Sequence, residues 1–276
     1  MSMTDEPTGE LTVAQQLTEA RQLVEDEREH IDNKLAAFDQ FATGVSRLSA
    51  DPMPHAAGSA TRDGVPESVS TALDHGTGSD DRIETVRSLF AETVRPYSIE
   101  DVAEPEPLLV TIREELGAKI ALSLSPSTDR PFTAELQAAI QSATDQCQAE
   151  LEAMEQGLAV EESDLKRVSE LQTAVADCLE RDQLSLPMLD FETLRDRHEK
   201  ISTFQHQCEV LAADRQSTLH ETTNHAVTAD LSQWPLVEYL YQPLAIDYPV
   251  LSTTARLVER CENRQRTIRE HLTQCH

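Results

Sequence analysis

One pair of residues in the sequence has the spacing of a helix-borne metal site. Glu27 and His30 form a Glu-x-x-His pair, which places two ligands on one helix face as in di-iron bundles. Such a site needs a second pair and two further carboxylates, and no other Glu-x-x-His occurs in the chain. The segment from His220 to His225 is similar to the zinc-protease motif, but Asn224 stands where the second histidine is needed. We therefore expect neither a metal site nor a cofactor.

The remaining motif classes do not indicate an enzyme either. The glycines outside residues 49–79 stand alone, so no glycine-rich loop can bring backbone N–H groups to a phosphate. No serine lies in the Gly-x-Ser-x-Gly pattern that exposes a nucleophile on a sharp turn. An active site between packed helices needs no such motif, so an enzyme with a bundle-core site stays as a third alternative. We predict a protein that is not an enzyme.

The charge of the chain is strongly one-sided. Its 276 residues include 50 Asp and Glu against 23 Lys and Arg, which gives a formal net charge of -27. At molar salt the Debye length falls to about 3 Å, so repulsion between exposed carboxylates is screened. The composition therefore predicts an acidic, halophilic protein of a salt-rich cytoplasm. An acidic disordered chain would lack the regular apolar spacing seen here, and the charge disfavours nucleic-acid binding over most of the surface.

Cysteines and hydropathy agree with a cytoplasmic location. The first ten residues lack the basic and apolar regions of a secretory signal, and no apolar run approaches the roughly 20 residues that span a bilayer. The five cysteines are odd in number and never spaced as Cys-x-x-Cys. We expect reduced thiols that act as small buried apolar groups, and no membrane contact.

Periodic apolar residues predict an all-α fold. Aromatic residues make up only 4% of the chain, and runs of β-branched residues are almost absent, which disfavours a large sheet. Residues 12–48 contain an apolar repeat every seven residues, as in helices that pack along their length, and Thr12 is the expected N-cap. The repeat comprises Leu17, Val24, Ile31, Phe38 and Val45. We predict an elongated antiparallel helical bundle with coiled-coil character.

Composition divides the chain into four segments. We expect a disordered N-terminus over 1–11, a long helix over 12–48, a flexible Pro/Gly/Ser-rich linker over 49–79, and a helical bundle domain over 80–276 that packs with the first helix. Within 80–276 the apolar spacing predicts helices over 80–95, 107–124 with a break at Gly117, and 133–181 with Thr133 as N-cap. Asp190 and Pro249 open the last two helices, and Pro235 opens a short aromatic turn between them.

Aromatic residues gather near the C-terminal part of an otherwise aromatic-poor chain. Tyr239, Tyr241 and Tyr248 lie within a segment that also contains Pro243 and Pro249. Buried tyrosines pack their rings and find a partner for the hydroxyl group, so a core corner is one interpretation. The alternative is a surface that binds a partner, which makes these three tyrosines candidate binding residues.

The final helix carries the only concentration of positive charge. Arg256, Arg260 and Arg264 follow one another at a spacing of four and form a stripe on one helix face. They either pair with carboxylates of a neighbouring acidic helix or contact nucleic acid. The first interpretation is favoured, because the chain offers abundant acidic partners.

Several short strings resemble a known group of proteins. These strings are Phe38 and Phe41, Glu92-Thr93-Val94, Phe132-Thr133, Asp190-Phe191, Arg215-Gln216, Tyr239-Leu240-Tyr241 and Tyr248-Pro249-Val250-Leu251. Together they resemble an uncharacterised haloarchaeal helical, coiled-coil-like family whose domain has no assigned function. The segment Arg95-Pro96-Tyr97-Ser98 departs from that pattern. The resemblance implies a halophilic source and supplies no activity, ligand or catalytic residue.

Sequence alone therefore favours a non-catalytic interaction or scaffold protein of a haloarchaeal cytoplasm. Its long helix faces would bind a protein partner or a second copy. The alternative is a regulatory module that contacts nucleic acid through the arginine-bearing C-terminal helix.

Overall fold

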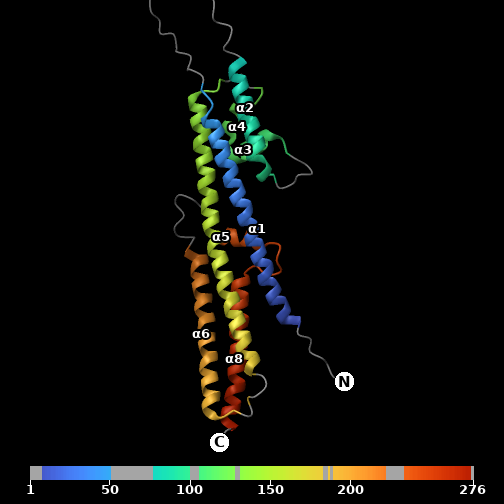
Figure 1. Ribbon diagram of the computed structural model, residues 1–276, viewed down its shortest axis with the longest axis vertical. Coiled ribbons are helices and arrows are strands. Elements are labelled where there is room, and N and C mark those ends of the chain that lie inside the picture. Colours follow the sequence, from blue (N-terminus) through green and yellow to red (C-terminus); the bar gives the residue numbers. More distant parts are fainter. Residues whose placement is uncertain are drawn as a thin grey trace, which may run out of the picture. The chain divides into compact units, whose positions relative to one another are not determined.

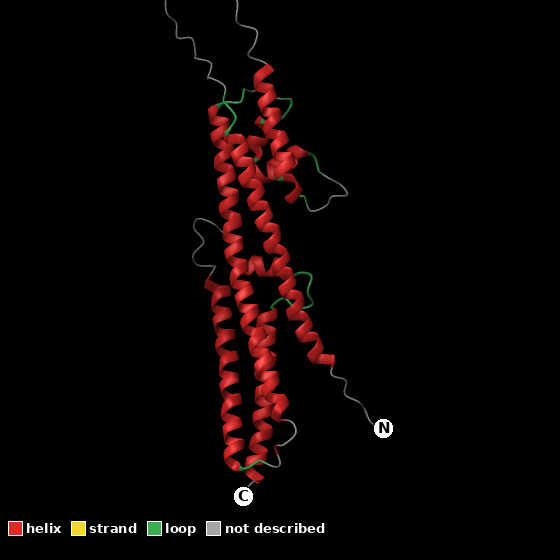
Figure 2. Ribbon diagram, viewed as in Figure 1, coloured by secondary structure: helices red, strands yellow, loops and turns green. Residues whose placement is uncertain are grey.

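The computed structural model describes residues 8–50, 77–99, 106–127, 131–182, 186, 189–221 and 233–274 (Figure 1). Over these residues it contains eight α-helices, one short 3₁₀ helix and no strand (Figure 2). The predicted all-α fold is confirmed. Residues 1–7 of the expected disordered N-terminus and residues 51–76 of the expected linker lie outside the described residues. None of the described helices has an apolar stretch long enough to cross a membrane.

The chain forms two compact units. One comprises Met1–Glu29 with Ala153–His276, and the other comprises His30–Glu152. Helices α1 (Thr8–Ser46) and α5 (Ala134–Asp182) contribute to both, because each unit boundary falls within a helix. The two units are described separately below, as the discontinuous unit and the central unit.

The central unit is built around aromatic residues. It contains the C-terminal half of α1, α2 (Thr77–Thr93), the 3₁₀ helix η1 (Arg95–Tyr97), α3 (Leu108–Leu116), α4 (Ala118–Ser123) and the first part of α5. Phe41 and Phe90 meet edge to face with ring centroids 5.5 Å apart, a favoured arrangement of aromatic quadrupoles. Gly117 separates α3 from α4 at φ +92°, a conformation that side-chain-bearing residues rarely adopt. The break predicted at Gly117 is confirmed.

Polar contacts fasten the ends of helices in the central unit. The side-chain amide of Gln137 on α5 donates to the carbonyl groups of Val45 at 2.9 Å and Leu48 at 3.0 Å, at and just beyond the C-terminal end of α1. Lys34 pairs with Glu115 at 2.7 Å, with both side chains largely buried. These contacts fix α1 against α3 and α5.

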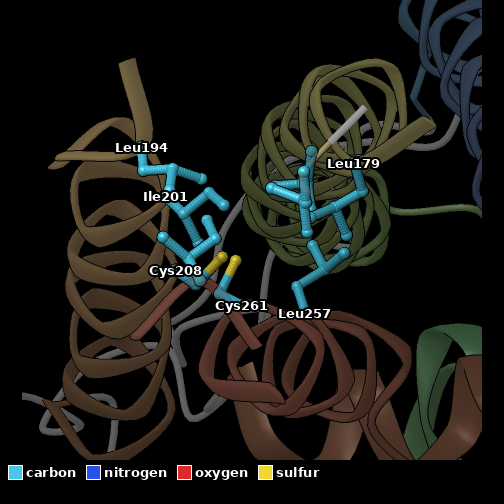
Figure 3. Packing of buried hydrophobic residues seen from close by; sticks show 9 residues of the cluster. Leu179, Leu194, Ile201, Cys208, Leu257 and Cys261 are labelled. Carbon is cyan, nitrogen blue, oxygen red and sulfur yellow. The ribbon is translucent and has the colours of Figure 1, made fainter. Parts of the chain in front are cut away.

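The discontinuous unit is built mainly from three long helical segments, which belong to α5, α6 (Phe191–Glu221) and α8 (Pro249–Gln274). It contains the second part of α5, α6, α7 (Gln233–Tyr241) and α8, with the first part of α1. α6 runs antiparallel to α5 and to α8 (Figure 1). Side chains of α5, α6 and α8 meet in one apolar core that includes Leu179, Leu194 and Leu257 (Figure 3).

The helix ends in the structure match those predicted from the sequence at some positions and differ at others. The hydroxyl group of Thr133 accepts the Leu136 N–H at 3.2 Å, so the predicted N-cap of α5 is confirmed. Asp190 caps α6 by accepting the Thr193 N–H at 2.8 Å. Hydrogen bonding to the Thr193 side chain, and next to its backbone N–H, lowers the pKa of the Asp190 carboxyl. α1 begins at Thr8, before the expected cap Thr12, and the expected aromatic turn after Pro235 is the helix α7. Proline is tolerated there because it lies in the first turn of α7.

Candidate functional site

A cluster of buried polar side chains joins three helices of the discontinuous unit. Arg215 on α6 donates through Nη2 to both oxygens of Glu161 on α5, at 2.6 Å and 2.5 Å. Its Nη1 donates to Asp164 on α5 at 3.3 Å. Tyr241, the last residue of α7, donates its hydroxyl proton to Glu161 at 2.9 Å. We call these four residues the ionic cluster.

The ionic cluster occupies positions that the helical repeat assigns to the core. Glu161 lies between Leu158 and Leu165 on the buried face of α5, and Asp164 follows three residues later on that face. Arg215 follows Leu211 at a spacing of four on the buried face of α6. Residues at these positions are carried into the interior by their apolar neighbours, whatever their own charge.

Burial in the ionic cluster is nearly complete. Glu161 is 0% exposed, Tyr241 1% and Arg215 2%. Such charges are tolerated only when they are paired and hydrogen-bonded, which the contacts above provide. Desolvation, followed by the neighbouring Glu161 carboxylate, raises the pKa of the Tyr241 phenol, so the hydroxyl stays protonated and donates.

A second arginine brings the charges closer to balance. Two carboxylates face one guanidinium within the ionic cluster. Arg167, 48% exposed, lies 3.5 Å from Asp164 and 3.2 Å from Asp214. The outer arginine therefore offsets the second buried carboxylate from the solvent side.

The ionic cluster is suited to holding helices in register and not to reacting with a substrate. A general acid or base must lie within hydrogen-bond reach of a substrate atom. The side chains of Glu161 and Arg215 are inaccessible and already bonded to each other. The arrangement fixes α5, α6 and α7 at one level, because slippage of any helix by one turn would separate the charges.

A groove lies on the outer side of α5 and α6, close to Arg167. Its volume is about 450 Å³, and none of the four ionic-cluster residues lines it. The floor is apolar and the edge polar: the lining residues are Arg167, Glu170, Leu171, Ala174, Phe204, His206, Gln207, Val210 and Leu211. Val210, which lines the groove, is 42% exposed. We call this feature the α5–α6 groove.

The family match covers most of the chain, including both features. The family model of a domain of unknown function, DUF7260, matches residues 15–265. The chain belongs to the DUF7260 family. The matched range includes the whole of α6 and α7, the ionic cluster and the α5–α6 groove, so both features lie within the DUF7260 domain. No functionally curated protein and no solved structure matches the chain significantly.

The structure places the three candidate tyrosines of the DUF7260 domain in different surroundings. Tyr241 is buried in the ionic cluster, whereas Tyr239 on the same helix is 57% exposed. Tyr248, just before α8, is partly buried, and its pKa is raised first by that burial and then by Glu238 and Asp247. The three rings therefore do not share one exposed face.

The candidate arginines of α8 also differ in exposure. Arg256 is exposed, while Arg260 and Arg264 are partly buried. We expected Arg264 to pair with a carboxylate of a neighbouring helix. Nε and Nη2 of Arg264 are buried without a hydrogen-bond partner among the described residues, so these two atoms do not supply that pair.

Glu27 and His30, the pair with metal-ligand spacing, do not form part of a metal site over the described range. Glu27 is partly buried and His30 exposed on α1, and no group of three or more His, Cys, Asp or Glu side chains among the described residues could hold a metal ion. Glu161 is a polar residue within the apolar repeat of α5, and nothing near it in the sequence indicates its partners. The one usable signal was a second charge, Arg215, at a core position of another helix.

Proposed function

We propose that this member of the DUF7260 family is a non-catalytic interaction or scaffold protein whose α5–α6 groove binds a helix of a protein partner. The observation that carries the proposal is the groove itself, where an apolar floor stays open to solvent and Val210 is 42% exposed. Exposed apolar surface that is rimmed by polar groups is typical of interaction sites.

The spacing of the groove residues favours a helical occupant. On α6, Phe204, Gln207 and Val210 recur every three residues, and on α5 Leu171 and Ala174 are three apart. Such rows are the ridges and grooves against which another helix packs, and an amphipathic helix docks into an apolar groove with its i, i+3, i+4 and i+7 residues. The partner helix would bury an apolar stripe against Phe204 and Val210.

Charge favours a basic partner over a second copy of the chain. The net charge of -27 makes self-association repulsive unless salt screens it, whereas a helix with Lys or Arg flanking its apolar stripe is attracted. Glu170 on the edge of the groove offers a carboxylate to such a helix.

The absence of a catalytic role is supported by how the buried ionisable groups are used. In the ionic cluster, Glu161 and Arg215 bond each other and Tyr241, which leaves no group directed at a substrate. A salt-rich haloarchaeal cytoplasm as the working environment is supported by the acidic composition, with only four lysines in the chain.

The test compares two exposed valines of the same unit. Val210 lies in the groove, and Val160, 40% exposed on α5, lies outside it. The protein with a photocrosslinking residue at either position is expressed in its native host and captured at high KCl. We expect one protein crosslinked from position 210 and not from 160, and its co-purification abolished by Val210→Arg but retained by Val160→Arg. Light scattering is measured on both variants.

Two results would count against the groove as the site for a partner helix. Equal crosslinking from both positions would show that the groove has no special role. A dimer in the parent protein that Val210→Arg converts to a monomer would show that the groove covers a second copy.

Contact with nucleic acid through α8 is the second candidate. It is favoured by Arg256, which is exposed on α8. Fluorescence anisotropy with labelled DNA and RNA, at the lowest KCl that keeps the protein folded, tests it. Absence of binding under that condition would exclude it, because lower salt strengthens phosphate contacts.

A further inference from the structure

Two cysteines from different helices face each other in the core of the discontinuous unit. Cys208 on α6 and Cys261 on α8 are both 0% exposed and belong to one apolar core cluster. Their sulfur atoms point toward each other (Figure 3), and each helix presents its cysteine to the partner helix. The two thiols are close enough for Cys261 to act electrostatically on Cys208.

The antiparallel packing of α6 and α8 produces this pairing. Ile201 and Cys208 lie seven residues apart on α6, and Cys261 and Ile268 lie seven apart on α8. All four are buried, so each helix directs one stripe at the other, and the two cysteines meet at one level of the stripes. Facing core positions of packed helices bring their side chains into contact, which a disulfide between them requires.

We propose that Cys208 and Cys261 are a disulfide-forming site that crosslinks α6 to α8 when the protein meets a small-molecule disulfide oxidant. The crosslink would close a loop of the chain that includes α7 and would hold the C-terminal helix in place. This modification is independent of the occupant of the α5–α6 groove.

The surroundings favour a disulfide over a metal ion. Metal binding requires thiolates, and a two-coordinate complex of a monovalent soft metal keeps a negative charge in the apolar core. A disulfide is neutral and fits there without such a cost. Burial raises the pKa of the Cys208 thiol to about 12 and that of Cys261 to about 11, although Arg260 lowers the latter. Oxidation is therefore slow and follows local opening of the helices.

The reaction proceeds by two exchange steps. The thiolate of one cysteine attacks a sulfur of the oxidant, which breaks the S–S bond, forms a mixed disulfide and releases one small thiol. The thiolate of the second cysteine attacks the protein-side sulfur of the mixed disulfide and releases a second small thiol. The two protons of the cysteines leave on the two released thiols, and the protein is oxidised by two electrons while the oxidant is reduced.

A third thiol, that of Cys178, could form a competing disulfide with Cys261. Cys178 on α5 acts electrostatically on Cys261 and is only partly buried. A crosslink between Cys178 and Cys261 would join α5 to α8 instead. The direction of the Cys208 and Cys261 side chains favours the α6 to α8 crosslink (Figure 3).

The experiment incubates the full chain with 2-hydroxyethyl disulfide, a neutral oxidant that the acidic surface does not repel. Trypsin places the five cysteines on five different peptides, with Cys208 in residues 201–215, Cys261 in 261–264 and Cys178 in 168–181. We expect the thiol titre of the denatured protein to fall from five to three. Non-reducing mass spectrometry should find peptide 201–215 linked to 261–264, and the oxidised protein should melt at a higher temperature than the reduced protein.

Two alanine variants complete the design. Cys208→Ala should abolish both the linked peptide and the rise in melting temperature, while Cys147→Ala, which changes a thiol of the central unit, should retain both. Circular dichroism shows whether each variant is helical. The proposal is overturned if the parent protein keeps five thiols, if peptide 261–264 is linked mainly to 168–181, or if oxidised and reduced proteins melt alike.

Discussion

Replacement of Arg215 by methionine tests the role of the ionic cluster. Methionine has a similar length and no charge, so Arg215→Met removes the guanidinium with little change in packed volume. Glu161 loses both hydrogen bonds from the Arg215 guanidinium and keeps the one from the Tyr241 hydroxyl. At 0% exposure its carboxylate cannot recruit water without opening the core.

The expected loss of stability follows from what that carboxylate can do. It either stays charged without its guanidinium partner, which in buried pairs costs about 3–5 kcal/mol, or it takes up a proton. For a carboxyl of ordinary acidity in the unfolded chain, protonation at pH 7 costs about 3.7 kcal/mol, and at pH 5 about 1 kcal/mol. We therefore expect Arg215→Met to lower the free energy of unfolding by about 3–4 kcal/mol at pH 7 and by about 1 kcal/mol at pH 5.

Urea unfolding at constant high KCl measures this loss. The single tryptophan, Trp234, belongs to α7, so its fluorescence reports on the unit that holds the ionic cluster. Arg167→Met is the matched control, because Arg167 also pairs with Asp164 but is 48% exposed, and it should cost at most about 1 kcal/mol. Adding Glu161→Gln to Arg215→Met should restore part of the loss at pH 7. Equal effects of Arg215→Met and Arg167→Met, or a loss independent of pH, would refute the reasoning.

Four further outcomes are expected. Helicity and melting temperature should fall as KCl decreases from molar to about 0.1 M, because the charge of -27 is then poorly screened; unchanged circular dichroism would contradict this. Gly117→Ala should lower the free energy of unfolding measured in urea by about 1–3 kcal/mol, because alanine is strained at φ +92°. Open space surrounds the position, so the loss reflects backbone strain and not a side-chain clash. Tyr241→Phe should cost about 1.5–3 kcal/mol by removing the bond to Glu161, and a neutral effect would show that the bond is dispensable. Stability should decline above about pH 9, because the folded protein keeps the protons of Cys208 and Cys261, whose pKa values are raised to about 12 and about 11, while the unfolded chain loses them near 9.0. Replacing both cysteines by alanine should make the urea midpoint fall less steeply with pH, and the remaining slope comes from groups such as Cys147 and Tyr241, whose pKa values are also raised.

Features that depend on neighbouring residues could be predicted from the sequence. Helix starts at Thr133 and Asp190 follow from hydroxyl and carboxylate oxygens that accept N–H groups a few residues later. The break at Gly117 follows from the conformational freedom of glycine. The start of α1 at Thr8 and the helical form of residues 233–241 were not predicted. The sequence pointed to a cap at Thr12 and a turn after Pro235, but such local preferences are weak and tertiary context overrides them.

The candidate site was less accessible to sequence reasoning. The aromatic segment drew attention to Tyr241, but nothing local indicates that its hydroxyl meets Glu161 from a helix far away in the chain. The arginine stripe of α8 suggested ion pairs for Arg264, but its Nε and Nη2 have no hydrogen-bond partner among the described residues. Composition gives the number of charged residues, but an ion pair forms only where the fold brings two oppositely charged side chains into contact.

The sequence by itself determined that this protein is helical, which faces of its helices are apolar, and that its surface is acidic. These properties arise from residues three or four apart and from overall composition, so they need no knowledge of the partner helix. Only the tertiary structure decided that Arg215 meets Glu161, that Cys208 faces Cys261, and that the α5–α6 groove stays open. The rotation and axial register of one helix against another settle such contacts, and both are set by side-chain packing across the whole interface.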